Sequence, residues 1–176
     1  MSNAAKLSSV TLADGTVLPG CRPDLLNIGD LLARNWSVIP LRTRSKVPAV
    51  KWEEYQRRHL TFDECERWFS TPGYNVGIVT GTISGIFVVD ADSPEALRWA
   101  HENLPACDLR VRTSKGLHLY YPYSGDRPMR NKCRVRFDGR QLEIDIRADG
   151  GYVVGPSSVH PSGHIYTREG AGWAWS

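Results

Sequence analysis

Apolar residues recur along the chain first at helical spacing and then at strand spacing, which predicts alternating helices and strands. Leucine and isoleucine positions between residues 25 and 32 follow the three- and four-residue spacing of a helix. Residues 38–41 predict a short strand, and residues 42–52 have the composition of a loop. Thr61, followed by three acidic residues, is typical of a helix start, and this helix should end near Ser70.

Residues 75–92 contain two β-branched runs separated by the glycine-containing segment 81–85, which predicts a hairpin of two core strands. Ser93 and Pro94 predict the N-cap and first turn of a helix that ends near Asn103. Further short strands are predicted at residues 109–112, 117–121, 142–146 and 152–154. The chain is therefore expected to be rich in strands, with three helices.

Length and composition favour one domain, because 176 residues with 41% hydrophobic content build a single core. We expect residues 1–22 to form an N-terminal arm or minor hairpin and residues 23–176 the main domain. The start of the sequence lacks the features of a secretory signal, and no apolar run is long enough to cross a membrane. A cytoplasmic location without membrane contact is the expectation.

The four cysteines lack the short separations of zinc knuckles, so reduced thiols are expected, with a zinc role for Cys133 left open. Net charge is only +3, but residues 110–147 carry ten basic and four acidic side chains. Such a segment is either a solvated basic face or a contact for a polyanion, and charge alone does not decide between them.

Asp90 and Asp92 follow an apolar strand and are two residues apart, so both carboxylates should point to one face. Two neighbouring carboxylates repel each other unless a cation lies between them, and carboxylate oxygens suit magnesium or manganese. The alternative is an acidic turn that caps the helix starting at Pro94. The pair alone is weak support for a metal site.

A second group of polar residues surrounds Gly116. Arg112, Ser114 and Lys115 offer cationic or hydroxyl donors for phosphate in a turn that precedes the strand carrying His118. Glycine allows a close backbone approach to an anion. His118 is either a phosphate donor or a strand histidine satisfied by a neighbouring backbone group.

A third constellation lies in residues 142–147, where apolar and charged residues alternate. Asp145 therefore shares a charged face with Glu143 and Arg147 and is available as a third metal ligand. An ordinary exposed strand face with ion pairs across strands is the alternative.

Taken in order, Asp90-x-Asp92, Ser114-x-x-x-His118 and apolar-Asp145 resemble the three motifs of the archaeo-eukaryotic primase superfamily, in its bifunctional primase-polymerase branch. The flanks are similar as well, in Lys46-x-Pro48, in residues 75–78 and in residues 150–163. The resemblance covers roughly residues 25–168.

The resemblance implies a two-lobed α+β fold whose antiparallel catalytic sheet is similar to an RNA-recognition motif and is flanked by helices. It implies that Asp90, Asp92 and Asp145 bind two Mg²⁺ or Mn²⁺ ions and that Ser114 and His118 hold the phosphates of an NTP or dNTP. Arg112 and Lys115 are added to the phosphate-binding residues only because they are basic and lie close to Ser114 in the sequence. The expected partners are a single-stranded DNA template, a primer and a downstream helicase or helical domain of a longer protein, in replication of phage or plasmid type.

The activity that the resemblance implies is a DNA primase and polymerase that transfers nucleotides to a 3′-hydroxyl by two-metal catalysis, and two alternative functions use the same residues. A metal-dependent nuclease or phosphohydrolase also needs three acids and two cations. A nucleic-acid-binding replication module with an inactive centre would bind DNA without depending on Asp90 beyond its charge.

Overall fold

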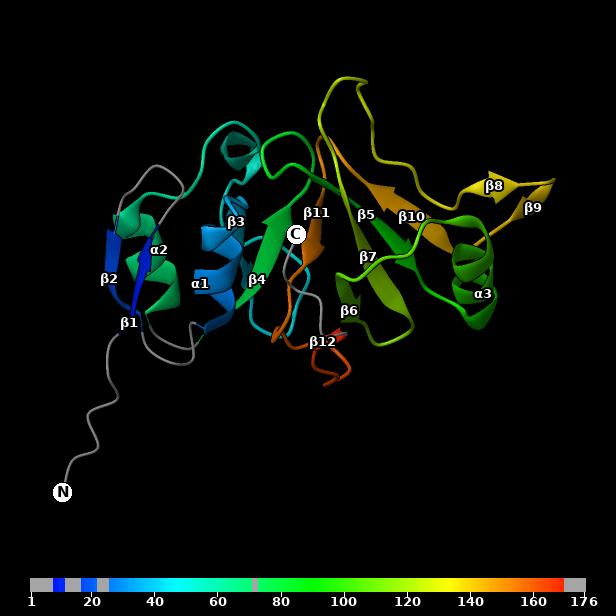
Figure 1. The fold of residues 1–176 in the computed structure, drawn as a ribbon. Helices are drawn as coiled ribbons and strands as arrows, with labels where there is room; N and C mark the ends of the chain where they lie inside the picture. The colour runs from blue at the N-terminus through cyan, green and yellow to red at the C-terminus, as the bar shows by residue number, and fades with distance from the viewer. Residues whose placement is uncertain (1–7, 12–16, 22–25, 71–72, 170–176) are drawn as a thin grey trace.

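The computed structural model describes residues 8–11, 17–21, 26–70 and 73–169 and shows two lobes, each built on an antiparallel sheet (Figure 1). This arrangement confirms the expected α+β class. None of the helices within these residues is long and apolar enough to cross a membrane.

The first lobe is a three-stranded sheet in the order β11-β4-β3, accompanied by two α-helices. Two short strands in residues 8–11 and 17–21 pair with each other, and the first of them contacts the first helix. Both strands lie in the predicted N-terminal arm. The boundary of that arm at residue 22 stays a prediction. The elements of this lobe are β1 (Ser8–Thr11), β2 (Val17–Cys21), α1 (Leu26–Ala33), β3 (Val38–Arg42), the 3-10 helix η2 (Glu53–Gln56), α2 (Phe62–Phe69), β4 (Tyr74–Val79) and β11 (Tyr152–Val154).

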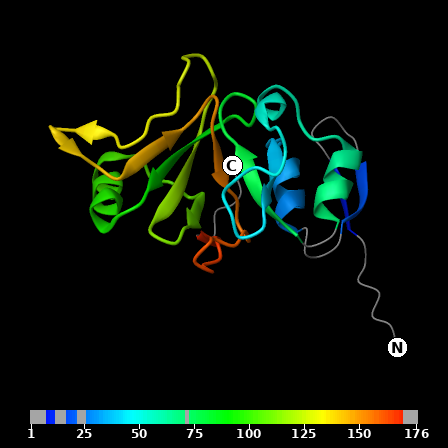
Figure 2. The same cartoon turned by 180° about the vertical axis from the view of Figure 1, so that it is seen from behind.

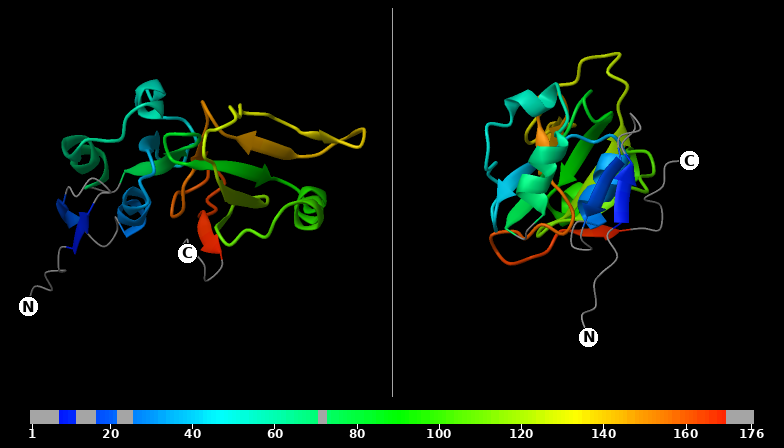
Figure 3. Two further views of the ribbon diagram at one scale, coloured as in Figure 1. Left: turned by 45° about the horizontal axis from the view of Figure 1, so that its top comes forward. Right: turned by 90° about the vertical axis from the view of Figure 1, so that its left-hand side faces the viewer.

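The second lobe is a five-stranded sheet in the order β10-β5-β7-β6-β12 with one helix at the end away from the first lobe (Figure 3). Seen from behind, a small hairpin extends beyond this helix (Figure 2). The elements are β5 (Ile86–Ala91), α3 (Pro94–Asn103), β6 (Arg110–Arg112), β7 (Leu117–Pro122), β10 (Ile144–Arg147) and β12 (Thr167–Glu169), with β8 (Arg136–Phe137) and β9 (Arg140–Gln141) as the hairpin.

The predicted hairpin of residues 75–92 is wrong, because its two strands belong to different sheets. β4 pairs with β3 and β11, whereas β5 pairs with β7 and β10, and only an isolated bridge joins Gly81 to Ile86. The turn is tied to other segments instead: Ser84 Oγ accepts the Ser37 amide at 2.9 Å, and Asp149 Oδ1 accepts the Thr82 amide at 2.9 Å. These contacts direct the chain from one lobe into the other.

The other predicted helices and strands are confirmed, although β10 begins two residues later than expected. Ser93 caps α3, with its hydroxyl accepting the Ala96 amide at 3.2 Å and Pro94 in the first helical position. Thr61 caps α2 in a capping box with Glu64, as its position before the acidic run indicates.

The two faces of the five-stranded sheet bury different surfaces. One face, with Val89, Leu119 and Ile144, packs on Ala96 and Ala100 of α3. The opposite face turns towards the first lobe, where the rings of Trp36 and Tyr120 stack with centroids 5.6 Å apart and planes 7° from parallel. The lobes therefore share a continuous apolar core.

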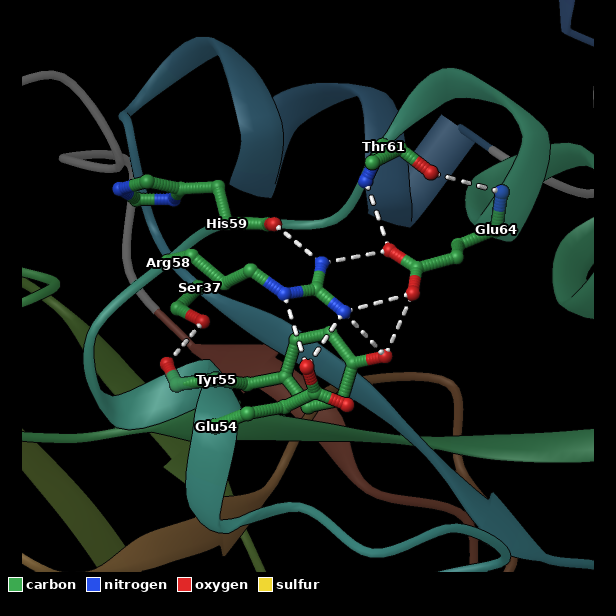
Figure 4. Close-up of polar contacts among 7 residues, drawn as sticks. All are labelled: Ser37, Glu54, Tyr55, Arg58, His59, Thr61 and Glu64. Atoms are coloured by element: carbon green, nitrogen blue, oxygen red, sulfur yellow. Dashed lines mark hydrogen bonds and ion pairs between the residues drawn. The ribbon is translucent and has the colours of Figure 1, made fainter.

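Glu64 anchors a polar cluster that fixes the start of α2 to the loop before it (Figure 4). Arg58 donates to both carboxylate oxygens of Glu64 at 2.8 Å, and the Tyr55 hydroxyl donates to the same group at 2.8 Å. The Thr61 amide completes the set at 2.9 Å. The Arg58 guanidinium lowers the pKa of Glu64 to about 2, because its hydrogen bonds favour the charged carboxylate.

Replacing Glu64 by Gln should lower the free energy of unfolding at pH 7 by about 1 to 2 kcal/mol, the range for a charged hydrogen bond that is partly screened by solvent. The folded pKa of Glu64, about 2, lies below the ordinary value of 4.5. Its contribution is therefore complete above the ordinary value and is lost as pH falls towards about 2. Urea unfolding of the wild type and the variant between pH 3 and 7 measures the difference.

Glu66→Gln, on the same helix but exposed, is the matched control and should change stability by less than about 0.5 kcal/mol. A difference between wild type and Glu64→Gln that stays constant with pH would contradict the assignment.

Candidate active site

Three of the predicted residues lie in one row across three strands. Asp145 of β10 is the register partner of Asp90 in β5, and Asp90 is in turn the partner of His118 in β7. Residues directly opposite each other on adjacent strands share a face of the sheet. Asp92 follows two residues after Asp90 and returns to that face, so the structure brings all three acids and the histidine together.

Asp90 is the most enclosed of the acids, with a side chain that is only 18% exposed. Burial raises the pKa of Asp90 to about 6, and the negative charge of Asp145 adds to this, while Lys46 and Arg147 oppose it. Among the described residues, no hydrogen-bond donor reaches Asp90 Oδ1. Burial and the neighbouring Asp90 likewise raise the pKa of Asp92.

His118 is buried beneath these carboxylates. Its Nε2 lies 3.6 Å from Asp90 Oδ1, and its ring centroid lies 5.9 Å from that of Tyr166. Burial lowers the pKa of His118 to about 4, so the imidazole is neutral at pH 7. A neutral imidazole carries one N–H donor and one acceptor.

Asp145 is held by two donors. Its Oδ1 accepts the backbone amide of Arg134 at 2.8 Å, and its Oδ2 accepts Arg147 Nη2 at 2.6 Å. Arg147 comes from the same strand two residues later, as the alternating pattern of residues 142–147 predicts. This pairing partly neutralises the acidic row.

A pocket of about 220 Å³ opens beside Asp90 and His118. Besides Asp90 and His118, side chains that the three motifs do not assign to the site also border it. They include Lys46, Trp52, Asn131, Arg147 and Tyr152. They come from separated loops and strands, which the motif order does not bring together.

The turn between β6 and β7 packs so closely against the end of β5 that only glycine fits at position 116. A Cβ atom on Gly116 would lie 1.8 Å from the carbonyl oxygen of Ala91. Thr113 Oγ1 shapes the turn by accepting the amides of Lys115 and Gly116 at 3.2 and 2.9 Å. Lys115 is consequently near enough to Asp92 to favour its charged form, and the half-buried Ser114 lies in the same turn.

Arg112 lies elsewhere. Its strand neighbour Val111 is the register partner of His118, so Arg112 points to the opposite face of the sheet. Its guanidinium pairs with Glu169 of β12. The structure therefore does not bring Arg112 to the pocket with the acids.

The acids suit a divalent cation in their chemistry, although their present rotamers do not form a ready-made site. No group of three or more His, Cys, Asp or Glu side chains in the described part of the chain is arranged to hold a metal ion. Asp145 is engaged by Arg147, while Asp90 presents a buried oxygen without a donor. Such an oxygen is a suitable ligand for a hard cation, because burial without a partner is unfavourable.

Comparison with known families assigns the chain. The model of the family described as "Bifunctional DNA primase/polymerase, N-terminal" matches residues 29–172, which contain the three-stranded sheet, the five-stranded sheet and every residue of the row. The chain therefore belongs to the bifunctional DNA primase/polymerase family, whose general activity is DNA priming and polymerisation on DNA and nucleotide substrates. A search of curated proteins found no match.

Replacing Asp90 by Asn should stabilise the metal-free protein by about 3 kcal/mol at pH 8, since each of the roughly two pKa units between 3.8 and about 6 corresponds to about 1.4 kcal/mol. The pKa of Asp90 in the folded protein, about 6, exceeds the ordinary value of 3.8. The stability that the protonated Asp90 carboxyl contributes is therefore complete below pH 3.8 and is lost as pH rises through about 6. The advantage of the variant should therefore grow across that interval. Thermal unfolding in a chelator measures it.

The exposed Asp108→Asn is the control and should leave the unfolding temperature unchanged at every pH. An Asp90→Asn variant less stable than wild type at pH 8 would show that the carboxylate is compensated in the folded state.

Proposed function

We propose that this domain transfers nucleotides from NTPs or dNTPs to a 3′-hydroxyl paired with a single-stranded template, in replication of phage or plasmid type. The observation that carries the proposal is the row Asp145-Asp90-His118, of which Asp90 and His118 line a pocket, in a chain of the primase/polymerase family. Nucleotidyl transfer needs several carboxylates from different strands around the reacting phosphate.

Asp90, Asp92 and Asp145 are the residues that would hold two Mg²⁺ or Mn²⁺ ions. When bound, such ions favour ionisation of the attacking hydroxyl and neutralise charge on the leaving pyrophosphate. The unpartnered oxygen of Asp90 and the mutual repulsion of the acids support this role. Asp145 would exchange its contact with Arg147 for a cation.

The remaining residues of the site position the nucleotide. Ser114 and Lys115 lie in the turn beside Asp92, where the Ser114 hydroxyl and the Lys115 ammonium are suited to phosphate oxygens. His118 is neutral and buried and has a hydrogen bond to the backbone of Val154, which it would exchange to donate to a phosphate oxygen without adding charge. Lys46 and Arg147 lie close enough to Asp90 to influence its pKa and complete a cationic rim.

A cationic edge runs along β10 and would contact template or primer phosphates. Residues 130–135 lie beside this strand, with Lys132 and Ile146 exchanging backbone hydrogen bonds at 2.9 and 2.7 Å. Six exposed basic side chains occupy the edge and the loop and hairpin that flank it: Arg127, Arg130, Lys132, Arg134, Arg136 and Arg140. The edge is next to the strand of Asp145, as a template path to the site requires.

Primer extension tests the function directly. On a primed single-stranded template with Mg²⁺ or Mn²⁺, the wild type should incorporate labelled dNTPs or NTPs. Asp90→Asn/Asp92→Asn should lower incorporation at least 100-fold, because charge stabilisation is a large part of phosphoryl-transfer catalysis. A chelator should abolish incorporation by the wild type, and an unprimed template tests initiation.

Asp63→Asn/Asp108→Asn changes two exposed acids away from the row and should leave incorporation unchanged. Degradation of the template without added nucleotides would identify a nuclease instead. Template binding without incorporation under any condition, and with no effect of the two Asn substitutions, would identify an inactive binding module.

The cationic edge predicts a salt-dependent affinity for single-stranded DNA. Arg127→Gln/Arg130→Gln should reduce the slope of log affinity against log salt by about 1.4, since each phosphate contact on a single strand contributes about 0.7. Fluorescence anisotropy with a labelled oligonucleotide between low and moderate salt measures both slopes.

Arg57→Gln/Arg67→Gln removes the same charge from exposed positions of the first lobe and should leave the slope near that of the wild type. Equal slopes for wild type and Arg127→Gln/Arg130→Gln would exclude these two arginines from the DNA path.

A further inference from the structure

The pocket beside the acids has two chemically different ends. Asp90 and Arg147, beside the neutral His118, form a charged end, whereas Trp52 and Tyr152 supply two aromatic rings. A ligand that fills both ends must join a charged group to a flat apolar group. This asymmetry is visible only in the fold, because Trp52 and Tyr152 are a hundred residues apart in sequence.

The aromatic end is rigidly built. The rings of Trp52 and Tyr152 meet edge to face with centroids 4.9 Å apart and planes at 69°. The Tyr152 hydroxyl donates to the carbonyl oxygen of Lys46 at 3.0 Å, which fixes its ring. Both residues pack against the core of the first lobe yet remain partly exposed, so part of each side chain borders the pocket.

Of three strand tyrosines, Tyr120, Tyr121 and Tyr152, the first two are packed away from the pocket. Tyr120 is buried and stacked on Trp36, and Tyr121 stacks on Phe87 on the face that carries α3. Of the three, Tyr152 is the one whose side chain borders the pocket.

Asn131 adds a polar group to the pocket. Its Oδ1 accepts the backbone amide of Ala148 at 2.8 Å, which leaves the Nδ2 group as a donor at the pocket wall. Gly151 makes this position possible, since a Cβ atom there would lie 2.4 Å from Asn131 Oδ1. The absence of a side chain at Gly151 therefore leaves room for the Asn131 side-chain amide.

We propose that Trp52, Tyr152 and Asn131 form the subsite for the nucleoside part of the incoming nucleotide. The base lies against the two rings, the Asn131 amide donates to an acceptor of the nucleoside, and the phosphates extend to the charged end. Stacking on aromatic rings tolerates every base, because each has a π-face. This inference rests on the proposed function and assigns it three substrate-contacting residues.

Calorimetric binding of a dNTP and of inorganic tripolyphosphate, at fixed Mg²⁺, separates the two ends of the pocket. Because the two rings lie at 69°, the base stacks on one of them and meets the other edge to face. Trp52→Ala and Tyr152→Leu should both weaken dNTP binding, by about tenfold for the ring that stacks and by less for the other. Binding of tripolyphosphate, which has no base, should stay within twofold of wild type and also shows that the variants are folded. Trp52→Phe should restore most of the dNTP affinity.

Phe62→Ala removes an exposed aromatic ring from α2 and is the matched control, with unchanged binding of both ligands. Equal loss of dNTP and tripolyphosphate binding in Trp52→Ala would overturn the subsite. Unchanged dNTP binding in both Trp52→Ala and Tyr152→Leu would also overturn it. If the wild type still extends a primer in that second case, the proposed function stands without the subsite. A wild type that binds neither ligand and extends no primer would overturn both.

Discussion

The register of β10 against β5 and of β5 against β7 is the constraint on which the site depends. It sets Asp145, Asp90 and His118 opposite one another, and a slip of one residue would turn each acid towards α3. That slip is strongly disfavoured, because the α3 face is lined by apolar residues such as Val89 and Ile144. The apolar core beneath the sheet thus determines which face carries the charges.

Placing these charges at the junction of two lobes has an energetic cost. Burial and the charge of Asp145 raise the pKa of Asp90, and burial and the charge of Asp90 raise the pKa of Asp92, so the site opposes the ionisation of both acids. The stacked Trp36 and Tyr120 and the shared core around them hold the lobes together despite this cost. Functional sites commonly retain such destabilising groups, since a relaxed site would lose the charge that its chemistry uses.

Local patterns were sufficient for most elements and for the acidic row, whereas long-range pairing was not. Thr61 and Ser93 predicted their helices because a cap is a local interaction. The hairpin of residues 75–92 was wrong because both runs are apolar throughout and carry no alternation that identifies their partner strands. Trp52 and Tyr152 were not assigned to the pocket for a related reason: only the packing of a loop on β11 brings them together.

The central proposal is that Asp90, Asp92 and Asp145 act together to hold divalent cations. Manganese titration followed by electron paramagnetic resonance, with a non-reactive dNTP analogue present, tests this claim directly, because bound and free Mn²⁺ give different signals. The account predicts bound Mn²⁺ beyond that held by the free analogue in the wild type, and loss of this fraction in Asp90→Asn/Asp92→Asn/Asp145→Asn. Undiminished Mn²⁺ binding by this variant, in a folded protein, would contradict the account.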